Sequence, residues 1–209
     1  MKKALFPSNP NLDLKEFTNS YLEILSKSME DIDPAEMYEV FESLLESIKK
    51  GVMIYTCGNG GSSAIAEHIV CDFMKGASTD STVRPKVVPL LSTPTLTAIA
   101  NDLSYDEVFS YQLSKLGKEN DVLMSVSSSG NSQNIVQAIM QAKALKMKTI
   151  SFVGFDGGEV KDISDYALHV KCDNYGICED AHHILMHIFA QYTRLRSIDD
   201  ATKVGNIKF

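Results

Sequence analysis

Two groups of histidines and carboxylates in this chain have spacings that could bind a divalent cation or transfer a proton. His68 and Asp72 are four residues apart, so they share one face of a helix. An imidazole and a carboxylate placed in this way can chelate a metal, or act as a base with an orienting partner. A simple surface pair is the alternative. The segment from Glu179 to His187 carries three of the chain's five histidines.

The second cluster imposes a distance constraint. Glu179 and His187 are eight residues apart in an amphipathic helical pattern, and the rise along a straight helix over that spacing is about 12 Å. Ligand atoms of one ion each lie only about 2 Å from it. If both residues bind the same metal, we expect them to come from different subunits, or Glu179 to precede the helix. We expect His183 to lie off the metal face and His182 to support a ligand.

Two loops rich in glycine and serine could hold an anion. They are Cys57-Gly58-Asn59-Gly60-Gly61-Ser62-Ser63 and Ser125-Val126-Ser127-Ser128-Ser129-Gly130-Asn131-Ser132, and each leads from an apolar run into a helical pattern. Backbone N–H groups and the dipole at a helix start attract anions, and glycine lets a ligand approach the backbone. The alternative is a serine-rich turn with an N-cap. Because two such loops occur, we predict a bound phosphate or polyhydroxyl compound. Neither loop has a nucleotide-binding spacing.

Short apolar runs that alternate with helical patterns must position these loops. The apolar runs are Val52–Tyr55, Pro85–Leu90, Val122–Val126, Thr149–Val153 and Ala167–Val170, and the helical patterns cover residues 62–75, 95–100, 131–145 and 179–196. This alternation predicts an α/β fold, a three-layer αβα sandwich around a central parallel sheet. Ligands of such sheets lie at the carboxyl ends of the strands, where both loops fall.

The segment before the first apolar run predicts two amphipathic helices between about Leu12 and Lys50. Asp33 is placed to cap the second helix, with Pro34 at its first position. We therefore expect an N-terminal helical segment (1–50), an α/β domain (51–196) and a C-terminal tail (197–209).

Composition excludes several classes of protein. The net charge is −7, which argues against a nucleic-acid partner. No apolar run approaches the roughly 18 residues of a membrane span, and the first residues show no apolar stretch of a signal peptide. The four cysteines, Cys57, Cys71, Cys172 and Cys178, form no C-x-x-C pair. We expect reduced thiols in a cytoplasmic protein.

Taken together, the motifs resemble one family. The chain resembles the sugar isomerase (SIS) domain proteins, whose fold is flavodoxin-like, and within them the phosphoheptose isomerases. The resemblance extends from about Tyr21 to Arg194. The matching pieces are residues 57–62, Leu96-Thr97-Ala98-Ile99-Ala100-Asn101-Asp102, Tyr105-Asp106-Glu107-Val108-Phe109, residues 127–132, Gly157-Gly158 and residues 179–187.

The resemblance implies a set of site residues. Sugar-binding positions fall on Asn59, Gly60, Gly61, Asn101, Asp102, Asp72 and Glu179, and phosphate-binding serines on Ser127, Ser128, Ser129 and Ser132. One Zn²⁺ per subunit is expected on His68, Asp72, Glu179 and His187. The family assembles as a homotetramer with active sites at subunit contacts, so we expect the N-terminal helices to pack on neighbouring subunits as well.

The chain departs from the family pattern at three places. The catalytic Glu of the family is Asp72, its metal-binding Gln is Glu179, and its Gly-Arg after the first domain helix is Lys75-Gly76. These changes could alter metal choice, pKa or substrate. Since all four metal positions keep ligand-capable side chains, we favour a variant subgroup with the same reaction.

The expected reaction converts sedoheptulose 7-phosphate to D-glycero-D-manno-heptose 7-phosphate through an enediol that a metal stabilises. Asp72 is the expected base at one carbon, and His187 is expected to move the proton on the oxygens or to act as the second base. This would be the first step towards heptose nucleotides for lipopolysaccharide, capsule or another conjugate. Two alternatives remain open: a non-catalytic SIS adaptor that binds a replication initiator protein, and an isomerase of another phosphosugar.

Overall fold

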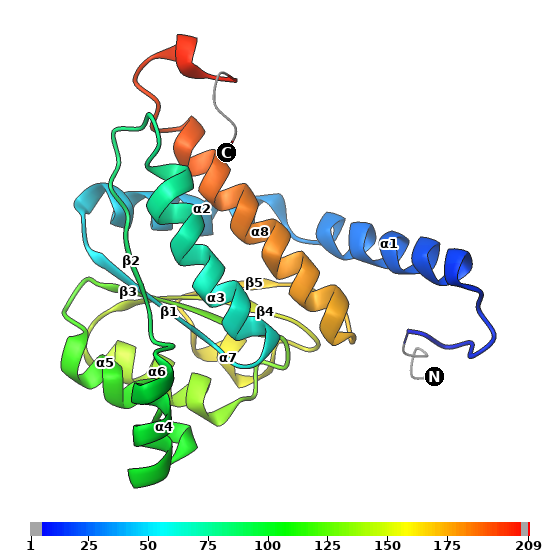
Figure 1. Cartoon of the computed structure of the whole chain (residues 1–209), viewed down its shortest axis with the longest axis horizontal. Helices are drawn as coiled ribbons and strands as arrows, with labels where there is room; N and C mark the ends of the chain where they lie inside the picture. Colours follow the sequence, from blue (N-terminus) through cyan, green and yellow to red (C-terminus); the bar gives the residue numbers. More distant parts are fainter. Residues whose placement is uncertain (1–5, 206–208) are drawn as a thin grey trace.

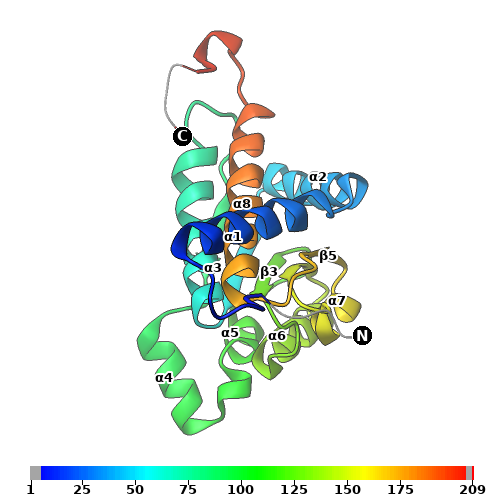
Figure 2. The same ribbon diagram turned by 90° about the vertical axis from the view of Figure 1, so that its right-hand side faces the viewer.

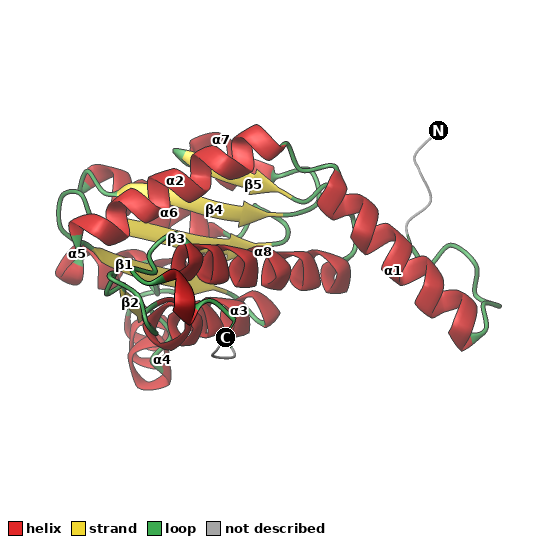
Figure 3. Cartoon of the chain, turned by 90° about the horizontal axis from the view of Figure 1, so that it is seen from above, coloured by secondary structure: helices red, strands yellow, loops and turns green. Residues whose placement is uncertain are grey.

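The computed structural model describes residues 6–205 and 209, and its centre is a five-stranded parallel sheet (Figure 3). The strands are β1 (Met53–Gly58), β2 (Lys86–Pro89), β3 (Val122–Ser127), β4 (Lys148–Val153) and β5 (Tyr166–His169). Their order is β2-β1-β3-β4-β5, and every neighbouring pair is parallel. Each strand overlaps one predicted apolar run, so the predicted parallel sheet is confirmed.

Helices cover both faces of this sheet (Figures 1 and 2). They are α1 (Leu14–Glu30), α2 (Pro34–Lys50), α3 (Gly61–Cys71), α4 (Thr93–Asp102), α5 (Ser110–Leu116), α6 (Gln133–Ala144), α7 (Gly158–Ile163) and α8 (Tyr175–Leu195). Buried residues of α2, α3 and α8 form one core cluster with the sheet, and buried residues of α5, α6 and α7 join a second. The predicted three-layer sandwich is therefore confirmed. No helix in the described part of the chain is long and apolar enough to cross a bilayer.

The two N-terminal helices form as predicted. The Asp33 side chain accepts a hydrogen bond from the Ala35 backbone N–H, Pro34 opens α2, and Gly51 ends it with φ +68°. Helix α1 extends away from the sheet (Figures 1 and 3) and is tied to α8 by a Tyr21–Asp180 hydrogen bond of 2.8 Å. The boundaries 1–50, 51–196 and 197–209 stay predictions, and residues 1–5 and 206–208 lie outside the described part.

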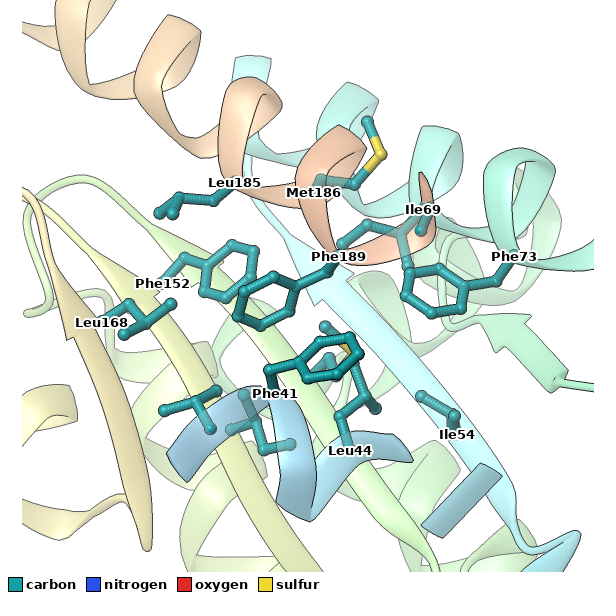
Figure 4. Close-up of a cluster of buried hydrophobic side chains, with 14 of the residues drawn as sticks. Phe41, Leu44, Ile54, Ile69, Phe73, Phe152, Leu168, Leu185, Met186 and Phe189 are labelled. Atoms are coloured by element: carbon teal, nitrogen blue, oxygen red, sulfur yellow. The ribbon is translucent and has the colours of Figure 1, made fainter. Parts of the chain in front are cut away.

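Helix α8 is anchored by the apolar face that it turns towards the sheet. Phe189 packs edge-on against Phe41 of α2 and Phe152 of β4, with ring centres 5.6 and 5.9 Å apart (Figure 4). Leu185, four residues earlier, is fully buried in the same cluster. Full burial of one large apolar side chain stabilises the folded state by about 1.5–3 kcal/mol. The rotation of α8 about its own axis is thereby fixed.

His182 belongs to this buried face. Its ring lies 6.1 Å from that of Phe152 and is fully buried. Burial lowers the pKa of His182 from 6.5 to about 4, and the neighbouring His183 lowers it further, while the Val153 backbone opposes the shift. The expectation that His182 supports a metal ligand is wrong, because its side chain faces the sheet.

Acid should therefore destabilise the fold through His182. Between pH 6.5 and about 4 the unfolded chain binds a proton there and the folded chain does not, so stability is lost as pH falls. Over this pH range, the free energy of unfolding of the native chain should fall by up to about 3 kcal/mol more than that of His182→Leu. Denaturant unfolding curves of both proteins, recorded at one protein concentration and several pH values, measure this difference. Parallel pH profiles would contradict it.

Candidate active site

The glycine and serine loops meet at the carboxyl edge of β1 and β3. A cavity of about 260 Å³ lies between them, lined by Asn59, Gly60, Gly61, Ser62, Val126, Ser127, Ser128, Ser129, Ser132, Tyr175 and Glu179. Because β1 and β3 are parallel neighbours, their loops must emerge side by side. A larger hollow of about 650 Å³ near Lys50 and Lys148 contains none of the predicted site residues.

Glycines allow the two loops to approach other parts of the chain. Gly60 has φ +54° and Gly130 has φ +64°, a region that L side chains rarely adopt. Gly61 opens α3, and a Cβ atom there would fall on the carboxylate of Glu179. The missing side chain therefore lets Glu179 rest against the N-terminus of α3, where the helix dipole favours a negative charge.

Asn59 is held in one orientation by two partners that the sequence did not reveal. Its amide exchanges two hydrogen bonds with that of Asn134, 2.8 and 2.9 Å long, and Tyr105 donates a third to its Oδ1 at 3.0 Å. Asn134 is buried in the first turn of α6. With both Oδ1 bonds occupied and one N–H engaged, the second N–H of Asn59 remains for a ligand.

A second site feature is a buried carboxylate between two imidazoles. Asp72 Oδ1 lies 3.3 Å from His68 Nε2, and Asp72 Oδ2 lies 2.6 Å from His187 Nδ1. One ligand atom from each residue lies within 4.8 Å of the others. Nitrogen and oxygen donors at this separation can converge on one tetrahedral ion with small side-chain movements. The arrangement therefore fits a divalent cation.

The helix that carries Asp72 has a wider, π-helical turn beginning at that residue. A continuous helix over 62–75 was expected, but α3 ends at Cys71 and a π-helical segment follows at Asp72–Ala77. The predicted helical segment is therefore present, but its last part has the wider π-helical turn, which the sequence pattern did not indicate. His68 and Asp72 still share one face, because the wider turn begins only at Asp72. Segments of this kind often occur at functional sites.

Glu179 lies apart from the three-residue cluster. It is the fifth residue of α8, which begins at Tyr175, so the alternative that Glu179 precedes the helix is excluded. Its carboxylate lines the serine cavity instead. Burial, assisted by the neighbouring Asp180, raises the pKa of Glu179. If Glu179 binds the same ion as His187, the remaining explanation is a contribution from another subunit.

Asn101 and Asp102 are also outside the cavity. They end α4 as exposed residues joined by a 2.8 Å hydrogen bond, and Figure 1 shows α4 projecting from the sheet. Within one chain these two predicted residues are not brought to the other site residues.

His183 lies next to the cluster but is not one of the three residues whose ligand atoms converge. Its ring centre is 5.6 Å from that of His68 and 6.2 Å from that of His187. Burial lowers the pKa of His183, and the neighbouring His68 and His187 lower it further. The four-residue spacing from His187 was the sequence signal, because it places both histidines on one face of α8.

The cluster predicts a measurable metal affinity. We expect about one divalent ion per chain, because nitrogen and carboxylate donors converge there. His68→Ala and Asp72→Asn should each lower the affinity for Zn²⁺ at least about tenfold, measured by competition with a chelator. The matched substitution His169→Ala, on β5, should leave the affinity unchanged. Equal affinity in all four proteins would exclude this metal site.

Comparisons with known proteins agree on one family. The SIS domain family model matches residues 16–154. The phosphoheptose isomerase of Helicobacter pylori strain 26695 is 39% identical over 178 residues, which cover 85% of this chain and 92% of that protein. The phosphoheptose isomerase of Clostridium acetobutylicum is 36% identical over 170 residues, 81% of this chain and 87% of that protein.

Solved structures give the same result for the fold. A phosphoheptose isomerase from Francisella tularensis superposes with a TM-score of 0.81 at 25% identity, over 88% of this chain and all of that one. Phosphoheptose isomerase from Neisseria gonorrhoeae gives 0.79 at 29% identity, over 87% and 98% of the two chains.

Proposed function

The chain belongs to the phosphoheptose isomerases, a branch of the SIS-domain family, and we propose that it converts sedoheptulose 7-phosphate to D-glycero-D-manno-heptose 7-phosphate. The resemblance expected from the motifs, and the isomerase class that follows from it, are confirmed. One observation of the structure carries the proposal most strongly: α3 begins at a cavity suited to a phosphate and leads to a buried carboxylate held between two imidazoles.

The phosphate end of the substrate would bind at the serine loop. Ser128 Oγ is buried and has no hydrogen-bond partner within residues 6–205, and the residue lines the cavity. Ser132 precedes α6, whose free backbone N–H groups and dipole attract an anion. An unpaired hydroxyl at this place supports a ligand that accepts hydrogen bonds, as a phosphate does.

The reacting end would lie at the cluster. On α3, Gly61 at the cavity and His68 in the cluster are separated by about 10 Å of helix rise, a span suited to a seven-carbon sugar with a terminal phosphate. Asp72 would take the proton from one carbon and return it to the next. His187, bonded to Asp72 at 2.6 Å, would move the proton between the two sugar oxygens. A bound Zn²⁺ would supply Lewis-acid stabilisation of the developing negative charge.

The remaining predictions about the assembly stay proposals. We propose a homotetramer with active sites at subunit contacts, supported by exposed apolar residues on the protruding α1, where Leu14 is 82% and Leu22 56% exposed. Asn101 and Asp102 would then serve a neighbouring site. Four free cysteines support the cytoplasm, and the net charge of −7 supports a small-molecule substrate rather than nucleic acid. We propose that the product supplies heptose for lipopolysaccharide or capsule.

Turnover of sedoheptulose 7-phosphate tests the function directly. The purified chain should form the aldose, observed by NMR, and Asp72→Asn and His187→Ala should each lower kcat at least about 100-fold because both remove a proton carrier. Circular dichroism should show an intact fold, and His169→Ala should keep full activity. No conversion by the native chain with Zn²⁺ added would favour the adaptor or another phosphosugar. Normal activity in either variant would remove the assigned roles.

Asn134 should act as a positioning residue. Asn134→Ala frees the Asn59 amide, so sugar binding should weaken and KM rise about tenfold, with a smaller change in kcat. Tyr105→Phe removes one hydrogen bond and should raise KM less. Steady-state kinetics separate the two parameters. An unchanged KM in both variants, or a loss confined to kcat, would contradict this role.

A further inference from the structure

One face of α8 carries three ligand-capable residues in a row. Glu179, His183 and His187 follow one another at intervals of four, so they lie along one side of the helix. The opposite side, with Leu185 and Phe189, is buried against the sheet. Figures 1 and 2 show α3 beside α8. Two i, i+4 pairs therefore face each other: His68 of α3 with Asp72 at the start of the π-helical segment, and His183 with His187 of α8.

The ring spacing of His68 and His187 matches a shared ion, and His183 lies slightly further from both. With a metal–nitrogen distance of about 2.1 Å and tetrahedral angles, the centres of two imidazoles on one ion lie about 5 Å apart. The ring centres of His68 and His187 are 5.0 Å apart, those of His68 and His183 are 5.6 Å, and those of His183 and His187 are 6.2 Å. His183 is half-buried, and it lies outside the three residues whose ligand atoms already converge, so its ring would have to turn towards them to bind the same ion.

Glu179 has a different set of neighbours. Its carboxylate rests at Gly61, at the N-terminus of α3, and it lines the serine cavity. A carboxylate at this position is stabilised by the helix dipole and can accept hydrogen bonds from sugar hydroxyls. Within one chain, Glu179 would lose that stabilisation and would have to span a helix rise of about 12 Å to reach an ion bound by His187.

We propose that His183 is the fourth ligand of the divalent-cation site, together with His68, Asp72 and His187, and that Glu179 binds sugar hydroxyls instead. This inference rests on the proposed function, since it concerns the ion that would assist the isomerisation. The site has three neutral imidazoles and one carboxylate, a donor set suited to Zn²⁺ and other transition metals.

Metal binding by the full-length protein tests the inference independently of turnover. His183→Leu should lower Zn²⁺ affinity at least about tenfold, measured by competition with a chelator. It should also change the visible absorption of the Co²⁺-loaded protein, which reports the number of nitrogen donors. Glu179→Gln should keep both the affinity and the Co²⁺ spectrum and instead raise KM for the sugar. His169→Leu is the matched control for loss of a histidine.

Histidine side-chain NMR of the native protein gives a second measurement that does not depend on a variant's folding. Addition of Zn²⁺ should shift the ring signals of His183 together with those of His68 and His187. The inference is overturned if His183→Leu binds Zn²⁺ as tightly as the native protein, or if Glu179→Gln loses the metal. It is also overturned if the His183 ring signals do not shift when Zn²⁺ is added.

These outcomes separate the inference from the proposed function. If the chain converts sedoheptulose 7-phosphate but its metal affinity is unaffected by His183→Leu, only the ligand assignment is overturned. Metal bound through His183 without conversion of the sugar overturns only the function.

Discussion

The burial of one face of α8 against the sheet is the interaction on which the rest of the site depends. Phe189 and Leu185 enter the core between α2 and β4, and this fixes the rotation of the helix. The residues on the other side, among them His183 and His187, must then face α3. A helix free to rotate could not keep an imidazole 2.6 Å from the Asp72 carboxylate, because that distance depends on the orientation of both helices.

The same sheet holds the two groups of candidate site residues apart. Parallel neighbours β1 and β3 deliver the glycine and serine loops to one edge, where helix N-termini favour an anion. The His68–Asp72–His187 cluster lies further along α3 and α8, away from those N-termini. A phosphate and a reacting carbonyl can therefore be held by different groups. Glu179, resting on Gly61, belongs by position to the first region rather than to the second.

Much of the fold could be predicted because local patterns and global packing agree. Each apolar run became a strand, and Asp33 and Pro34 began a helix as their chemistry requires. The short helices α5 and α7 were missed, since six or seven residues carry little periodic signal. The π-helical segment at Asp72 was missed for another reason: an extra residue in one turn leaves no regular spacing to detect.

The sequence by itself determined the family, the parallel sheet, the two loops rich in glycine and serine, and the His68–Asp72 pair, because these depend on residue type and on spacing along one element. Only the tertiary structure decided which side chains meet across elements. It brought His187 and His183 to His68, placed Glu179 at the glycine loop, joined Asn134 to Asn59, and left Asn101 and Asp102 exposed. Such contacts depend on how α3, α6 and α8 pack on the sheet, and spacing along the chain carries no information about distances between separate elements.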